Sequence, residues 1–299
     1  MKIALTGSLG NIGKPLTEIL VKKKHDVTVI SNNAERQKEI ENLGAKAAIG
    51  SIEDVDFLTK TFRNADVVFC MEAVATAEMF NPDFDIVAAY IHIAEKFVQA
   101  INKAGVKKVV HLSSIGAHAQ KGFGLMKMHH EAEKVMQTLP EDVGVKIMRP
   151  VGFFSNLYRS MQSIKMQGAI ISNYGGDKKE PWVSPKDIAA TIAKEMELPF
   201  NGKSIRYIAS EELSPNEVAK ILGDAIGKPE LKWLCIPDEQ LLQGMLSIGM
   251  NKAVAEGFIE MQAKQRTGEI FEDYNKHTPE FGEVKLSDFA KEFAAAYNQ

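Results

Sequence analysis

The segment LMKMHHEAEK (residues 125–134) contains two adjacent histidines. Histidine is the side chain whose ordinary pKa lies closest to neutral pH, so these two residues are candidates for proton transfer. Apolar residues recur around them at helical spacing, which predicts a helix. Leu125, His129 and Ala132 then share one face of this helix, and His130 lies elsewhere. We therefore expect His129 to face the interior and His130 to face solvent. From periodicity alone, a buried structural histidine is the simpler interpretation of His129.

Polar side chains near this helix are candidates to act with His129. Glu133 follows it by four residues, one helical turn, and is expected to hold its imidazole. Ser113 and Ser114 end an apolar run, on the edge of a parallel sheet where ligands bind. These two hydroxyls fit either a bond to a bound molecule or a cap on the turn.

A glycine-rich turn, TGSLGNIGKP (6–15), follows the first apolar run and precedes the first helical pattern. Gly7 suits a tight turn, Gly10 lets a pyrophosphate approach the backbone, and Gly13 lets the helix pack closely on the strand. The amides and dipole at the helix N-terminus favour phosphate. A plain tight turn is the alternative, but the strand–turn–helix context favours a dinucleotide site.

The segment ISNNAERQK (30–38) is expected to lie near the adenosine ribose and bears on the choice of cofactor. A carboxylate there would bind the 2′-hydroxyl of NAD, and a basic residue would bind the 2′-phosphate of NADP. No carboxylate ends this strand; Asn32 and Asn33 are hydrogen-bonding residues, and Arg36 follows one helical turn later. The pattern favours NADP(H) and leaves NAD(H) open. A solvated surface position explains Arg36 equally well.

The elements that must position these residues alternate between strands and helices. Apolar runs predict strands at residues 2–7, 25–30, 45–50, 65–71, 107–114, 145–150 and, more weakly, 203–210. Helical patterns cover residues 14–24, 86–105, 214–228 and 238–265. Such alternation predicts the α/β class, a doubly wound parallel sheet with helices on both faces and a smaller C-terminal α/β lobe. We place a dinucleotide-binding domain at residues 1–155. Residues 156–299 mainly form the lobe on the substrate side, with some segments returning to the sheet.

Composition narrows the class of protein. The 299 residues carry a net charge of −3, so no basic surface for nucleic acid is expected. There are two cysteines, Cys70 and Cys235, which fit neither a disulfide framework nor a zinc site. The N-terminal sequence does not read as a signal peptide, and no run of about 18 apolar residues occurs. We expect a cytoplasmic protein, monomeric or homodimeric, that acts on a small molecule and has no membrane or nucleic-acid partner.

Several segments together resemble a known family. They are TGSLGNIG at the start, AGVKKVVHLSSIG (104–116), HHEAEKVM (129–136), RPVGFFSNL (149–157) and WVSPKDIA (182–189). In this order and spacing they are similar to the NmrA-like group of atypical short-chain dehydrogenases/reductases, which have a Rossmann fold. Within that group the chain looks most like the quinone oxidoreductases that use NAD(P)H. The resemblance spans nearly the whole chain.

The resemblance implies a role for each matching segment. The backbone of Gly7, Ser8, Leu9, Gly10, Asn11 and Ile12 would wrap the pyrophosphate. Asn32 replaces an arginine that many relatives use for the 2′-phosphate. The resemblance also places further residues around the cofactor: Ser51 and Ile52 at the adenine, Met71, Glu72 and Ala73 at the ribose and nicotinamide, Ser113 at the carboxyl edge, and Val151, Gly152 and Phe153 over the nicotinamide. Asp187 would be structural, tying a helix start to the second lobe.

The catalytic tyrosine and lysine of short-chain reductases would fall at Leu125 and His129, so the tyrosine is absent. By resemblance, His129 would bond the nicotinamide ribose or supply a proton to the reduced substrate. Tyr158 is a conceivable substitute donor that nothing in its spacing requires. The expected activity is hydride transfer from NAD(P)H to a quinone or a similar electrophilic carbonyl compound, which needs little acid catalysis. Met245, Met250, Phe258 and Met261 would form an apolar pocket wall or simply pack the lobe.

A second function remains open. Some NmrA-like proteins resemble dinucleotide sensors that regulate partners and catalyse no reaction, and the missing tyrosine suits such a protein. Turnover separates the two hypotheses, because a reductase consumes NADPH when an acceptor is supplied and a sensor does not.

Overall fold

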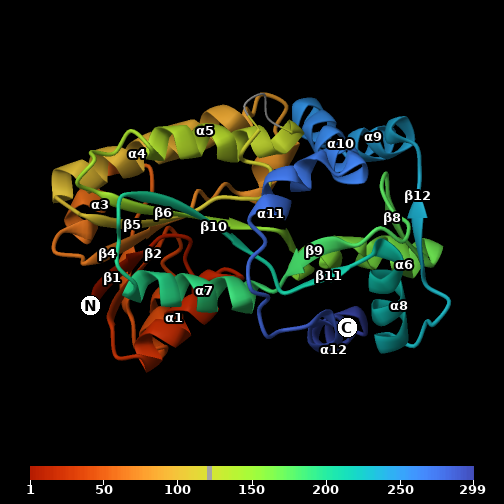
Figure 1. Cartoon of the computed structure of the whole chain (residues 1–299), viewed down its shortest axis with the longest axis horizontal. Coiled ribbons are helices and arrows are strands. Elements are labelled where there is room, and N and C mark those ends of the chain that lie inside the picture. Colours follow the sequence, from red (N-terminus) through yellow and green to blue (C-terminus); the bar gives the residue numbers. More distant parts are fainter. Residues whose placement is uncertain (120–122) are drawn as a thin grey trace.

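The protein, described by a computed structural model over residues 1–119 and 123–299, is built on a seven-stranded parallel sheet (Figure 1). The order of the strands is β10-β6-β5-β4-β1-β2-β3. Their bounds are Lys2–Leu5 (β1), Asp26–Ser31 (β2), Lys46–Ile49 (β3), Val67–Cys70 (β4), Lys108–Leu112 (β5), Gly144–Pro150 (β6) and Lys203–Ile208 (β10). β1 lies in the middle of the sheet, with β2 and β3 added on one side of it and β4, β5, β6 and β10 on the other. The order of the strands therefore reverses between β1 and β4, which creates the switch point where open α/β sheets bind ligands. The predicted α/β class and doubly wound sheet are confirmed.

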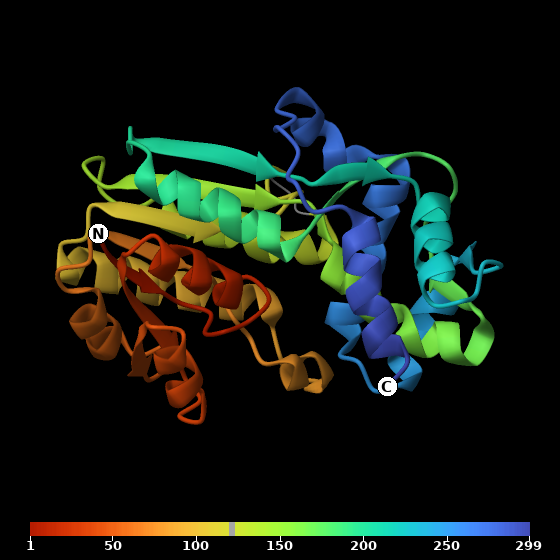
Figure 2. The same cartoon turned by 90° about the horizontal axis from the view of Figure 1, so that it is seen from below.

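Helices cover both faces of this sheet, as the continuous apolar strands predict. One face carries α3 (Val55–Phe62), α4 (Ile86–Ala104) and α5 (Lys127–Met136). The other carries α1 (Gly13–Lys22), α2 (Arg36–Asn42) and α7 (Pro185–Glu197). Figures 1 and 2 show these two layers with the sheet between them. Each layer encloses its own core, and α4 ends at Gly105 (φ +73°), the stop predicted for it.

The rest of the chain forms a second lobe beside one end of the sheet (Figure 1). Its small sheets comprise β7 (Gly152–Phe153), β9 (Glu180–Val183) and β11 (Glu211–Leu213), and separately β8 (Ala169–Ser172) and β12 (Lys232–Cys235). Its helices are α6 (Met161–Gln167), α8 (Pro215–Ala225), α9 (Asp238–Ser247), α10 (Lys252–Thr267), α11 (Glu272–Lys276) and α12 (Leu286–Tyr297). Short 3₁₀ turns are η1 (Thr76–Phe80), η2 (Gly124–Met126), η3 (Phe154–Ser160) and η4 (Glu269–Phe271). A third core of aromatic and aliphatic side chains fills this lobe.

Two predictions about the second lobe meet different outcomes. The pattern over 214–228 is a single helix, α8, which begins with a capping box: the Ser214 hydroxyl accepts from the Glu217 amide, and the Glu217 carboxylate accepts from the Ser214 amide. The helical pattern over 238–265 is two helices, because Gly249 (φ +83°) breaks it and Asn251 caps the second. No helix in the described part of the chain has the length and apolar character needed to cross a bilayer.

Candidate dinucleotide and substrate site

The glycine turn lies at the carboxyl end of β1, and two of its glycines are required, Gly7 by its left-handed backbone conformation and Gly13 by a close backbone contact. Gly7 has φ +88°, and a Cβ there would lie 2.1 Å from the Met71 Cε atom. A Cβ at Gly13 would lie 2.0 Å from the Ser8 carbonyl oxygen. These contacts explain the tight turn and the close packing of α1.

Gly10 differs from the other two glycines, because the protein itself leaves room beside it. The nearest atom to a Cβ at Gly10 would be the Gly7 carbonyl oxygen at 3.4 Å, and Gly10 and Asn11 are exposed. Leu9 and Ile12 point into the core, so they offer a ligand only their backbone. Ile12, which precedes α1, provides no side-chain cap for the first amides of the helix. The turn thus presents open backbone and free amides, which fits a pyrophosphate.

The end of β2 is joined to the turn by a pair of serines. The Ser8 hydroxyl donates to the Ser31 hydroxyl at 2.9 Å, and Ser31 accepts from the Asn33 amide at 3.2 Å. Asn32 and Asn33 are exposed beside this junction. Ser31, which also lies in the segment predicted to end near the adenosine ribose, is buried and connects β2 to the glycine turn.

Arg36 and the predicted adenine contacts lie on exposed parts of the same region. The Arg36 guanidinium donates to Glu39 at 2.6 Å, and Lys14 donates to the same carboxylate at 3.4 Å. Ser51 is exposed and Ile52 half-buried after β3, which pairs with β2. These positions surround the end of β2, as the predicted adenosine site requires.

The segment after β4 is fixed against the turn by Thr6. The Thr6 hydroxyl accepts from the Met71 amide at 2.8 Å and donates to the Met71 carbonyl at 3.3 Å. Met71 therefore meets Gly7, and Ala73 is exposed beyond it. Glu72 lies differently: it is buried and faces away from this surface.

Glu72 forms a buried ion pair with His111 of β5. The His111 Nε2 atom lies 2.9 and 3.1 Å from the two Glu72 carboxylate oxygens, and both side chains are almost fully buried. Burial alone would lower the pKa of His111, but the neighbouring Glu72 charge and hydrogen bond outweigh it, and the pKa is raised. Glu72 thus joins the segment after β4 to β5 in the interior. This geometry does not support its predicted direct contact with a cofactor.

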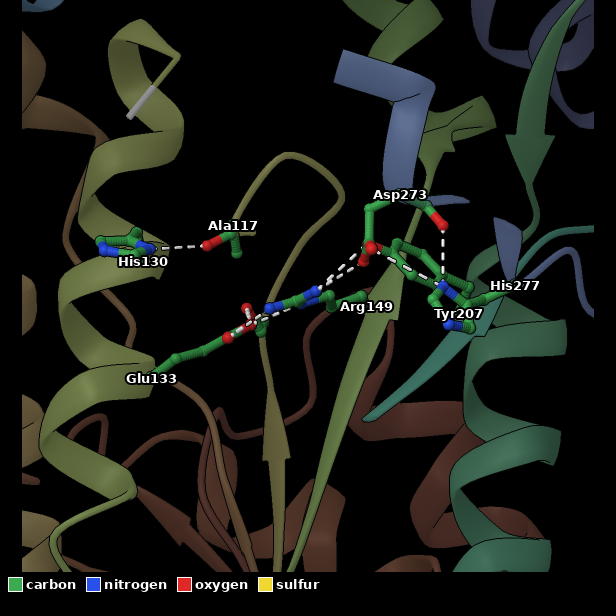
Figure 3. Close-up of polar contacts among 8 residues, drawn as sticks. Ala117, His130, Glu133, Arg149, Tyr207, Asp273 and His277 are labelled. Carbon is green, nitrogen blue, oxygen red and sulfur yellow. Dashed lines mark hydrogen bonds and ion pairs between the residues drawn. The ribbon is translucent and has the colours of Figure 1, made fainter. Parts of the chain in front are cut away.

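His129 lies near this pair on α5. Its Nδ1 atom is shielded from solvent and has no hydrogen-bond partner among the described residues, and its ring stands edge-on to Tyr90 at 5.2 Å between centroids. Burial lowers the pKa of His129 to about 4. The imidazole is therefore neutral at physiological pH, so it offers hydrogen bonds and lacks the positive charge of the lysine it replaces. His130 is half-buried, and its Nδ1–H donates to the Ala117 carbonyl at 2.8 Å (Figure 3).

The expectation that Glu133 holds the His129 imidazole is wrong. Glu133 points the other way and accepts two hydrogen bonds from Arg149 of β6, from Nε at 2.8 Å and Nη2 at 2.6 Å (Figure 3). It also accepts the Ser113 hydroxyl. Ser113 is buried and its hydroxyl is already used, so it stabilises this network at the end of β5.

The network extends from Arg149 to the second lobe. Arg149 also donates to the Tyr207 hydroxyl and to Asp273, each at 3.2 Å, and Tyr207 donates to Asp273 at 2.6 Å. Figure 3 shows these side chains converging from β6, β10 and α11. The prediction missed this network. The available signal was a charged residue, Arg149, near the carboxyl end of a mostly apolar strand.

The RPVGFF segment leads from β6 into the second lobe. Val151 is buried and its amide donates to the Ile208 carbonyl at 3.1 Å; Gly152 and Phe153 are half-buried in β7. Phe154 instead packs in the third core. Val151, Gly152 and Phe153 therefore lie beyond the carboxyl end of β6, and Phe153 is the partly accessible ring of the two.

Two other residues have roles that differ from catalysis. Asp187 accepts from the Ser210 hydroxyl at 2.5 Å and from the amides of Glu283 and Val284 at 3.2 and 3.1 Å, which ties α7 to the C-terminal segment, as the structural role predicted. Tyr158 packs in the third core at 5.1 Å from the Phe289 ring, which does not support it as a proton donor.

Leu125, at the position of the missing tyrosine, lies under α10. A Cβ at Gly257 of α10 would be 3.2 Å from the Leu125 Cδ2 atom, and a Cβ at Gly124 would be 1.9 Å from the Gly257 carbonyl oxygen. The two glycines let the backbone of α10 rest directly on the start of the α5 segment.

The sheet order, the glycine turn at its switch point and the uncapped N-terminus of α1 define a Rossmann-type dinucleotide-binding protein. The chain belongs to the NmrA-like family, whose sequence model matches residues 1–290. This confirms the resemblance identified from the sequence motifs.

Individual relatives are more distant. The chain is 24% identical over 262 residues to an NAD(P)H azoreductase of Xenophilus azovorans, covering 87% of this chain and 86% of that protein. Its fold is similar to that of an NADPH-dependent quinone oxidoreductase of Escherichia coli in complex with NADPH (TM-score 0.80, 18% identity, 97% and 99% of the two chains). It is also similar to a Citrobacter triphenylmethane reductase in complex with NADP(H) (TM-score 0.76, 18% identity, 97% and 100%).

Proposed function

We propose that the protein is an NADPH-dependent reductase that transfers hydride to a quinone or a similar small electrophilic acceptor. The observation that carries this proposal is the turn from Gly7 to Gly13, where Gly10 and the α1 amides are left open at the switch point of the sheet. The azoreductase relative and the two similar structures, named as reductases, support it.

The turn would hold the pyrophosphate on its backbone, and Met71 and Ala73 would lie beside the nicotinamide ribose. Exposed Asn32 and Asn33 would bind the adenosine ribose, and Arg36 would turn from Glu39 toward a 2′-phosphate. The bound cofactor supplies the hydride.

The chemistry near α5 favours an electrophilic acceptor. Leu125 has no proton to give, and His129, with its pKa lowered to about 4, is neutral and donates at most a hydrogen bond. A carbonyl that becomes a strongly basic alkoxide would need an acid here. A quinone does not, because its reduced oxygen is a comparatively stable anion that takes its proton from water.

The alternative is a dinucleotide sensor without turnover, and the observation that favours it is Leu125 at the tyrosine position. The deciding experiment is NADPH oxidation with a panel of quinones and azo compounds, on wild type and His129→Ala. His92→Ala, an exposed histidine of α4, is the matched control. Quinone-dependent turnover that falls about tenfold in His129→Ala alone is expected, the effect of losing one hydrogen bond of about 1.4 kcal/mol. Tight NADPH binding with no turnover on any acceptor would overturn the reductase proposal.

A further inference from the structure

One buried asparagine joins α10 to the segment after η1, across about 170 residues of sequence. The Asn251 Nδ2 atom donates to the carbonyls of Asn81, Pro82 and Phe84 at 2.7, 3.1 and 3.2 Å, respectively. Its backbone amide donates to the Met79 carbonyl at 2.8 Å. Its Oδ1 atom accepts from the Val254 amide at 3.1 Å and so caps α10.

A hollow of about 410 Å³ lies at this junction. Its apolar side chains come from both segments: Phe80, Pro82 and Phe84 from one, and Met250 and Ala253 from the other. This volume falls in the range of small-molecule sites, and apolar and aromatic lining is typical of them. The methionine can adapt its shape to different flat ligands.

The charges around the hollow are unbalanced. Lys252 and Glu256, one helical turn apart, pair with each other at 3.7 Å. Asp83 is exposed and has no ion-pair partner among the described residues. The rim therefore carries a net negative charge, which disfavours an anionic ligand.

The two walls of the hollow belong to segments that also lead to the proposed site. The segment that supplies Phe80 and Phe84 begins at Met71, which meets Gly7 of the glycine turn. Along α10, Gly257 follows Lys252 by five residues, about 7.5 Å of helix, and rests on Leu125 at the start of the α5 segment. Both walls of the hollow thus continue into elements that border the site where hydride transfer is proposed.

We propose that this hollow binds the uncharged, apolar end of the acceptor, and that Asn251 is the positioning residue that holds its two walls together. The inference rests on the proposed reductase function and adds the class of acceptor: flat, apolar and without negative charge at its distal end. The net negative charge at Asp83 selects against sulfonated or carboxylated acceptors of the same shape.

The test uses equilibrium binding to the full chain saturated with NADPH, so that it does not depend on turnover. The probes are 2-naphthol and naphthalene-2-sulfonate, which share a ring system and differ in charge, titrated by calorimetry. Wild type is expected to bind 2-naphthol about fivefold or more tightly than the sulfonate, the effect of one partly screened charge. Asp83→Asn should narrow that ratio, and Glu239→Gln, an exposed acidic residue of α9 outside the lining, should not.

Two substitutions test Asn251 itself. Asn251→Asp keeps the cap on Val254 but places a carboxylate against three carbonyl oxygens. Asn251→Ser also keeps a capping hydroxyl, and it loses the donors without adding charge. We expect 2-naphthol to bind about tenfold more weakly in Asn251→Ser and more weakly still in Asn251→Asp, with the Kd for NADPH unchanged. With a quinone acceptor, KM should rise and kcat should change little.

Several outcomes would overturn the inference. They are equal binding of the two probes, no binding of 2-naphthol to the wild type, or full binding by a folded Asn251→Ser variant. If no quinone is turned over but 2-naphthol binds as expected, the reductase proposal fails while the ligand site stands, so the two failures are distinguishable.

Discussion

Glu133 and Arg149 face each other inside the protein and share two parallel hydrogen bonds, of 2.8 and 2.6 Å. The pair joins α5, which carries His129, to β6 in the sheet. Arg149 continues to Tyr207 and Asp273, so the same guanidinium also holds β10 and α11 (Figure 3). One buried cation thus fixes the carboxyl edge of the sheet to the second lobe.

Removing the charge of Glu133 should destabilise the fold. In Glu133→Gln the buried Arg149 loses its main partner, and the free energy of unfolding is expected to fall by about 3 kcal/mol. Denaturant unfolding at neutral pH measures it. Glu131→Gln is the matched control two residues earlier, because its pair with exposed Lys134 should contribute less than about 1 kcal/mol. Equal losses in both variants would contradict a structural role for the buried pair.

His129 should make stability depend on pH in a defined window. Its pKa is lowered from 6.5 to about 4 in the folded state, so between these values the unfolded chain binds a proton that the folded chain does not. Stability is therefore complete above pH 6.5 and falls as the pH decreases toward 4. Wild type should lose about 3 kcal/mol more than His129→Gln over this range. Parallel pH profiles of the two proteins would show that His129 titrates normally.

The glycines of the turn should separate folding from cofactor binding. A Cβ at Gly13 would overlap the Ser8 carbonyl oxygen, so Gly13→Ala is expected to lower both stability and affinity for NADPH. Gly10→Ala has room in the protein, so its melting temperature should stay near that of the wild type. Its Kd for NADPH should nevertheless rise about tenfold, because the methyl group occupies the surface left for the pyrophosphate. Unchanged NADPH binding by Gly10→Ala would place the cofactor elsewhere.

Arg36 should determine the preference between the two nicotinamide cofactors. Arg36→Ala removes one of the two basic side chains in the predicted segment 30–38, and the Kd for NADPH is expected to rise about tenfold while that for NADH stays the same. Glu39→Gln is the complementary variant: it frees Arg36 from its ion pair and should tighten NADPH binding slightly. Isothermal titration with each cofactor measures both effects. Equal losses for NADPH and NADH in Arg36→Ala would show that Arg36 does not contact a 2′-phosphate.

Strand–helix alternation was sufficient to predict the sheet, because a parallel strand buried on both faces is apolar throughout. The weak run at 203–210 also proved to be a strand, β10 at the sheet edge. The glycine turn was also predictable from local sequence, since Gly7 is required by its positive φ and Gly13 by its contact with the Ser8 carbonyl oxygen, both within a short stretch of chain.

The polar interior could not be derived in this way. Glu133 has two neighbours in reach, His129 on its own helix and Arg149 on a strand, and only the packing of α5 on the sheet decides between them. The same holds for Glu72, which follows β4 on the expected edge but turns inward to His111. The sequence did not indicate that Asn251 joins α10 to the segment after η1. Its partners are backbone carbonyls, which every sequence provides.

The close approach of Gly124 and Gly257 also bears on how this protein can be altered by engineering or by evolution. Restoring the tyrosine and lysine of ordinary short-chain reductases requires only Leu125→Tyr and His129→Lys on paper. The Leu125 side chain packs against Gly257 of α10, so a larger tyrosine ring at this position would have to be accommodated against that helix. Introducing that catalytic pair into this chain therefore involves the packing of α10 as well as the two substituted positions.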